Sequence, residues 1–79
     1  MRAKQFVSEA ELAALARKYR VESGKKRAQA ARELGVARPS LIYAEDHPNK
    51  SFTKLRCRII EMYSPYEVKG PVFLLDKKK

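Results

Sequence analysis

The segment Lys25–Glu45, KKRAQAARELGVARPSLIYAE, carries the most informative pattern in this 79-residue chain. Its pattern predicts one helix from about Lys25 to Leu34, capped by Ser23 or Gly24, a tight turn at Gly35, and a second helix over Arg38–Asp46. Small residues stand where the two helices must touch, and apolar residues point inward. These positions are Ala30, Ala31, Leu34, Val36, Leu41 and Ala44. The arrangement is typical of a helix-turn-helix, whose second helix lies in the major groove of DNA.

A helix before this unit is predicted by the capping box of Ser8 and Glu11. Val7 is placed to pack on Leu12, and the helix is expected to end near Val21. Apolar residues recur at helical spacing, which predicts a buried stripe from which Arg20 is excluded. The stripe consists of Leu12, Leu15, Ala16 and Tyr19.

A helix after the unit is predicted from Ser51, as its cap, to Ser64-Pro65. Its expected buried face is Phe52, Leu55, Ile59 and Met62, with Ile60 and Tyr63 alongside. The residues expected outside that face are Lys54, Arg56 and Arg58. Val72–Leu75 then predicts a β-strand, which Tyr66–Val68 could partner across a short turn.

The expected fold is therefore mainly α: a compact four-helix helix-turn-helix domain with a C-terminal β-strand or short hairpin. Residues 1–7 are expected to form a short basic arm and residues 8–64 the helical domain. Residues 65–79 are expected to form the strand and a basic tail. A chain of this length has room for one core.

Charge indicates the class of partner. The chain carries 18 Lys and Arg against nine Asp and Glu, a net charge of +9. Such a surface attracts polyanions through counterion release, which favours nucleic acid. The alternatives are a charge that serves solubility alone, or contact with an anionic membrane.

Several classes are disfavoured by the composition. One cysteine, Cys57, allows no internal disulfide and suits a reducing compartment, and we expect a buried, inert thiol. Cys57 and the one histidine, His47, cannot make a four-ligand zinc site. No paired-carboxylate site, activated nucleophile or glycine-rich phosphate loop is present, so we expect no enzyme, no cofactor and no metal. The absence of a long apolar run favours a cytoplasmic protein.

The first turn of the Lys25–Leu34 helix carries Lys25, Lys26 and Arg27, the wrong sign for the positive end of a helix dipole. A phosphate docked at that end would remove the misfit, and three solvated side chains are the alternative. On the next helix the outward face is expected to hold Arg38, Pro39, Ser40, Ile42, Tyr43 and Asp46. Ile42 is open to two interpretations, contact with thymine methyl groups or burial in the core.

The run Ala30-Ala31-x-x-Leu34-Gly35-Val36-Ala37-Arg38-x-Ser40-Leu41, with Glu45 four positions on, resembles the lambda-repressor/Cro-like helix-turn-helix superfamily. The resemblance implies that Arg27 clamps a phosphate and that Arg38 is the first base-reading position. It also implies that Pro39, Ser40 and Tyr43 face the groove. Ala30 and Ala37 depart from the usual larger aliphatic and capping residues. Lys26 and Lys50 are expected to contact the DNA backbone.

A module of this size covers little DNA, so two copies on an inverted-repeat operator are expected. The C-terminal strand is apolar on both faces and is expected to have no partner sheet in a four-helix domain. Pairing with its symmetry mate would bury its open edge and make a homodimer. The residues concerned are Val72, Phe73, Leu74 and Leu75. The alternative is a tail that folds back over its own helices.

The leading hypothesis is a sequence-specific DNA-binding transcriptional regulator, a repressor of bacterial or phage type that inserts helix 38–46 into the major groove of double-stranded DNA. One alternative is an accessory protein that binds nucleic acid without sequence preference. Another is an antitoxin-like module that binds a protein partner.

Overall fold

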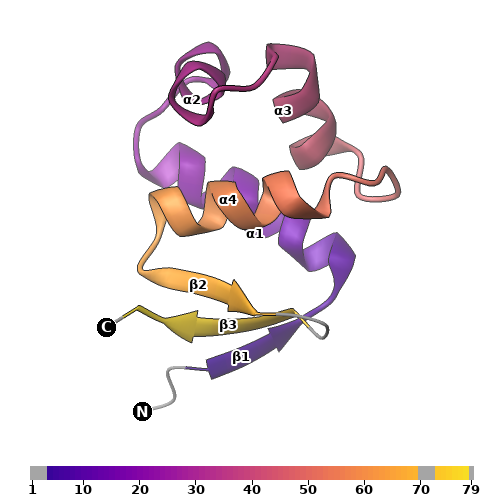
Figure 1. Ribbon diagram of the computed structural model, residues 1–79, viewed down its shortest axis with the longest axis vertical. Helices are drawn as coiled ribbons and strands as arrows, with labels where there is room; N and C mark the ends of the chain where they lie inside the picture. The colour runs from indigo at the N-terminus through magenta and orange to yellow at the C-terminus, as the bar shows by residue number, and fades with distance from the viewer. Residues whose placement is uncertain (1–3, 70–72, 79) are drawn as a thin grey trace.

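Four helices and three strands follow one another along the chain (Figure 1). The structure, a computed structural model, describes residues 4–69 and 73–78. Its elements are β1 (Lys4–Val7), α1 (Glu9–Glu22), α2 (Arg27–Leu34), α3 (Arg38–Asp46), α4 (Thr53–Tyr63), β2 (Tyr66–Lys69) and β3 (Phe73–Lys77). The predicted fold class, mainly helical with a C-terminal antiparallel hairpin, is confirmed.

The start of α1 is confirmed in detail. Ser8 Oγ accepts a hydrogen bond from the Glu11 backbone N–H at 3.2 Å, and Glu11 Oε1 accepts one from the Ser8 N–H at 2.8 Å. Leu12 and Ala16 are fully buried in the core. The prediction that Arg20 lies outside the buried face is wrong, because this side chain is buried against α3.

The turn between α1 and α2 is longer than predicted. Gly24 has φ +72°, and its N–H donates to the Val21 carbonyl at 2.9 Å, while the Lys25 N–H donates to the Arg20 carbonyl at 3.3 Å. Both bonds close the end of α1 in a Schellman motif. Residues 23–25 therefore belong to the end of α1, so α2 begins at Arg27 with Lys26 as its N-cap rather than Ser23 or Gly24.

The end of α2 is as predicted. Gly35 has φ +70°, its N–H donates to the Arg32 carbonyl at 3.2 Å, and the Val36 N–H donates to the Ala31 carbonyl at 3.0 Å. This is a second Schellman motif, which sends the chain into α3. α3 has the predicted bounds, with Pro39 in its first turn.

α4 differs from the prediction on two points. It begins at Thr53 with Phe52 at the N-cap, not with Ser51 as the cap. Its buried residues are Leu55, Arg56, Ile59 and Ile60. Arg56 is therefore inside rather than outside, and Met62, expected inside, is 47% exposed. The spacing of apolar residues could not show that buried hydrogen-bond acceptors surround the Arg56 side chain, because these acceptors lie on other segments of the chain.

The three strands form an antiparallel sheet of order β1-β3-β2. The prediction of a short basic arm over residues 1–7 did not foresee that Lys4–Val7 is a strand, which pairs with β3 in a register that sets Phe6 opposite Leu74. Residues 1–3 lie outside the described residues. This pairing joins a strand near the N-terminus to a strand near the C-terminus. A pattern within either segment therefore could not predict it.

β3 is the central strand, and this overturns the expected mode of dimerisation. Its two edges are hydrogen-bonded to β1 and β2, and Leu75 is 1% exposed in the core. Phe73, Leu74 and Leu75 thus have no free edge to offer a second copy, and Val72 lies outside the described residues. The alternative prediction was a tail that folds back over its own helices. It agrees with the structure, in which Leu75 of β3 belongs to the core.

Candidate nucleic-acid interface

α2 and α3 form the end of the molecule opposite the sheet (Figure 1). α3 buries Leu41 and Ala44 completely, which fixes the face that it turns inward. On the other side Arg38 and Pro39 are exposed, Ser40 and Ile42 are half-buried, and Tyr43 is 42% exposed. The helix predicted to read DNA thus presents its predicted outer residues to solvent. Ile42, left open by the sequence, takes an intermediate position.

A buried ion pair anchors the inner face of α3 to α1. Arg20 donates from Nε to Glu45 Oε2 at 2.6 Å and from Nη2 to Glu45 Oε1 at 2.9 Å. Its Nη1 also donates to the Lys25 carbonyl at 2.7 Å, in the turn before α2. A bidentate pair of this kind fixes both distance and orientation. Arg20 therefore sets the position of α3 and of the chain entering α2 at once.

Arg56 holds the same, C-terminal end of α3 from the side of α4. Its side chain is 0% exposed, and it donates from Nε to the Ala44 carbonyl at 2.8 Å and from Nη2 to the His47 carbonyl at 2.7 Å. Its Nη1 donates to Glu9 Oε1 at 2.6 Å. A guanidinium at a helix C-terminus satisfies carbonyls that have no partner within the helix and compensates the negative end of its dipole.

Arg58 does the same for α2. It donates from Nη2 to the Leu34 carbonyl at 2.5 Å. α4 thus presents one arginine to the end of α2 and another to the end of α3, so it acts as the support of the two-helix unit. Sequence reasoning placed both arginines on a solvent face and missed this role.

The N-termini of α2 and α3 are basic and lack side-chain caps among the described residues. Lys26 and Arg38, at or next to these termini, are exposed. Backbone N–H groups at a helix start point outward and bind anions well. This arrangement can hold phosphate oxygens, as predicted for α2.

Arg27, the predicted phosphate clamp, is engaged within the protein. Its Nη2 donates to both carboxylate oxygens of Asp46, at 2.9 and 2.8 Å. Its Nε lies 3.4 Å from Glu45 Oε1. The predicted residue is at the predicted place, with a carboxylate partner that the sequence did not reveal.

Tyr43 is held in place by three neighbours. Its ring lies 6.1 Å from Phe52 in a stacked arrangement and 5.2 Å from His47 edge to face. Lys50 Nζ lies 5.8 Å from the ring centroid. The structure therefore brings Tyr43 together with Lys50, two predicted site residues from different segments.

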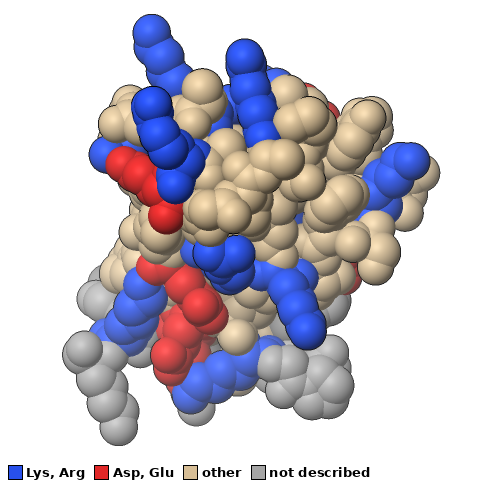
Figure 2. Space-filling view, turned by 45° about the horizontal axis from the view of Figure 1, so that its top comes forward, with Lys and Arg blue, Asp and Glu red and all other residues tan. Residues whose placement is uncertain are grey.

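Basic side chains project from the end formed by α2 and α3 (Figure 2). Lys26, Arg32 and Arg38 are exposed there. The acidic Glu33 near this end accepts hydrogen bonds from Tyr63 Oη and Lys25 Nζ, which hold the pKa of its carboxyl below the ordinary value. The ion pair with Lys25, at 3.0 Å, offsets its negative charge. The face is therefore positive, although it contains acids.

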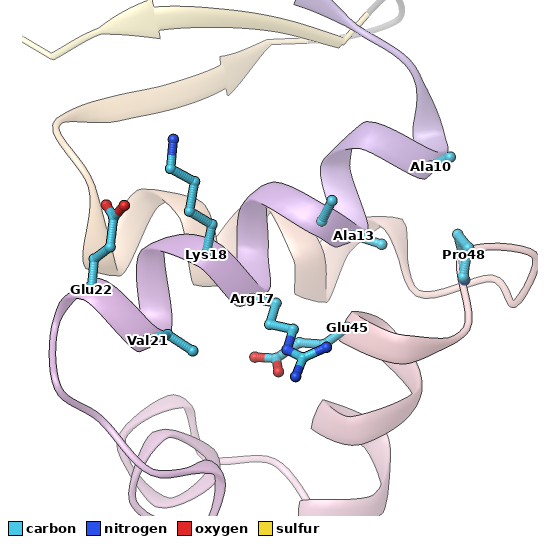
Figure 3. Close-up of a pocket in the computed structure, with 9 residues that line it drawn as sticks. Ala10, Ala13, Arg17, Lys18, Val21, Glu22, Glu45 and Pro48 are labelled. Carbon is cyan, nitrogen blue, oxygen red and sulfur yellow. The ribbon is translucent and has the colours of Figure 1, made fainter.

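A separate groove of about 570 Å³ runs along the exposed side of α1 (Figure 3). Small residues form much of it, and Arg17 and Glu45 point into it from α1 and α3. Within the described residues no three His, Cys, Asp or Glu side chains gather as metal ligands. Cys57 is half-buried, and burial, with nearby Glu61 and Glu9, raises the pKa of its thiol, which keeps it protonated.

Comparisons of the chain with protein-family models, with curated proteins and with solved structures found no match. No helix among the described segments is both long and apolar enough to cross a membrane. The interpretation of the α2–α3 end therefore depends on its own geometry.

Proposed function

We propose that this protein is a sequence-specific DNA-binding regulator that inserts α3 into the major groove. The observation that carries the proposal is the exposed outer face of α3, with Arg38 and Tyr43 in solvent while Leu41 and Ala44 are locked in the core. A helix held rigidly by one face and bare on the other is what groove insertion requires. The resemblance of Ala30–Leu41 to the lambda-repressor/Cro-like pattern supports the same mode.

Arg38 is the residue to which we assign base recognition. It opens α3, and the N-terminal residues of a recognition helix come nearest to the base edges. Its guanidinium can donate two hydrogen bonds to one guanine edge, which discriminates by about 1–3 kcal/mol. Tyr43, fixed by Phe52 and His47, offers its ring to sugars and thymine methyl groups.

Phosphate contacts would position the domain. The free N–H groups at the start of α2 and the exposed Lys26 lie on the same end as α3. Lys50, beside the Tyr43 ring, extends the basic edge. Such contacts set register and affinity without choosing a sequence. By occupying an operator the protein would exclude polymerase and so repress transcription.

We also propose that two copies bind an inverted repeat, because one module of this size covers too little DNA for high specificity. The interface cannot form by pairing of a free β3 edge, since both edges of β3 are paired within the chain. Footprinting reports the stoichiometry directly, because a dimer protects two half-sites about 10 base pairs apart, one helical turn.

The decisive experiment is a selection from random duplexes with the wild-type protein and with Arg38→Ala. The wild type is expected to yield a defined site, and Arg38→Ala is expected to lose that preference while keeping weak general binding. Lys18→Ala is the matched control, since Lys18 is an exposed cation on α1 that points away from α3 (Figure 3). It should select the wild-type site. Unchanged discrimination by Arg38→Ala, or no preference in the wild type, would refute the proposal.

A further inference from the structure

Two helix ends of unfavourable charge meet where α2 begins and α3 ends. The first turn of α2 holds no acidic residue and starts with Arg27, and the last turn of α3 holds no basic residue and ends with Glu45 and Asp46. A cation at a helix N-terminus and an anion at a C-terminus each oppose the helix dipole. Arg27 and Asp46 compensate one another across the two helices.

In the protein without DNA, the Arg27 guanidinium contacts two carboxylates, those of Asp46 and Glu45. Nη2 donates to both oxygens of Asp46, and Nε faces Glu45, whose carboxylate already binds Arg20. Asp46 also lies 3.9 Å from Arg17 Nη1. A phosphate approaching the start of α2 therefore finds Arg27 with its Nη2 protons in use and a negative charge beside it.

The Arg27–Asp46 pair is open to exchange, unlike the pair behind it. The side chains of Arg27 and Asp46 are 26% and 32% exposed, whereas those of Arg20 and Glu45 are 8% and 0% exposed. Ion pairs that water reaches contribute little stability. A DNA phosphate offers the same guanidinium two oxygens that share one negative charge, as the Asp46 carboxylate does, so the two can exchange.

We infer that Asp46 sets the affinity of the proposed interface by competing with a DNA phosphate for Arg27. The inference rests on the proposed function. It assigns to the Asp46 carboxylate the place at Arg27 that a DNA phosphate would take in the complex. In the free protein Asp46 neutralises Arg27. On DNA, Arg27 leaves Asp46 for the backbone, and the affinity is lower by the cost of that exchange.

The test is a double-mutant cycle of Arg27→Ala and Asp46→Asn, measured on an arbitrary duplex of about 30 base pairs at several salt concentrations, since phosphate contacts dominate non-specific binding. Asp46→Asn alone is expected to bind about tenfold more tightly at low salt. Its plot of log affinity against log salt should keep the wild-type slope, because Arg27 neutralises one phosphate in both proteins. In the Arg27→Ala background, Asp46→Asn should change the affinity by less than about twofold, with an unchanged slope.

Glu67→Gln is the matched control, because it removes one acid and an ion pair, to Lys69, at the sheet end of the molecule. It should leave affinity and slope at wild-type values. Far-UV circular dichroism and thermal unfolding confirm that each variant folds.

Each of the following outcomes overturns the inference. An equal gain from Asp46→Asn in both backgrounds means that Asp46 merely repels DNA. A loss means that Asp46 positions Arg27 for DNA. Wild-type protein that binds no duplex refutes the proposed function and this inference together, whereas binding without coupling between the two residues refutes the inference alone.

Discussion

Replacing the buried Arg56 with methionine tests the central packing argument. Met keeps most of the side-chain volume but removes the donors to the Ala44 and His47 carbonyls and to Glu9. Breaking a buried, charge-assisted network by deleting one partner costs about 3–5 kcal/mol. A domain of 79 residues has a free energy of unfolding of about 4–12 kcal/mol, so Arg56→Met should lose a large share of it.

The assay is urea unfolding followed by circular dichroism. With a slope of about 1 kcal/mol per molar, the urea midpoint should fall by about 3–5 M, or the variant should be unfolded without urea. Arg58→Met is the matched control, because Arg58 is exposed and makes one bond, to the Leu34 carbonyl. It should cost about 1 kcal/mol. Equal costs for the two variants, or less than about 1 kcal/mol for Arg56→Met, would refute the reasoning.

Two further predictions concern a turn and a titrating pair. Gly35→Ala should cost about 1–2 kcal/mol from backbone strain alone, because φ is +70° and a Cβ there meets nothing within 4 Å. Thermal unfolding measures this, and an unchanged melting temperature would contradict it. Tyr63→Phe should raise the pKa of Glu33 toward its ordinary value of 4.5, because the Tyr63 hydrogen bond is the main cause of its lowering. In the wild type this bond adds stability that is lost as pH falls through the lowered pKa; a ¹³C NMR titration showing an unmoved Glu33 midpoint would count against it.

Much of the site was predictable from the sequence. The bounds of α3, the turn at Gly35 and the exposure of Arg38, Pro39 and Tyr43 follow from capping, left-handed glycine and helical spacing. The position of Lys26 at the start of α2 was also close to the prediction. These features depend on residues within four positions of one another.

The partners of the arginines were not predictable in the same way. Arg20 finds Glu45, Arg27 finds Asp46 and Arg56 finds Glu9, across separations of 25, 19 and 47 residues. A charge off the apolar stripe is normally solvated, so helical spacing assigned Arg20 and Arg56 to water. Only the packing of four helices creates the enclosed acceptors that bring them inside.

The order of the helices, the turn that joins α2 to α3 and the outer face of α3 all follow from the amino-acid sequence, because they arise from local backbone preference and periodicity. Three features instead depend on the packing of the whole chain: Lys4–Val7 is a strand, β3 is central rather than a free edge, and Arg27 faces a carboxylate. Strand pairing and ion pairing depend on which segments become neighbours, and that is settled when the whole core closes.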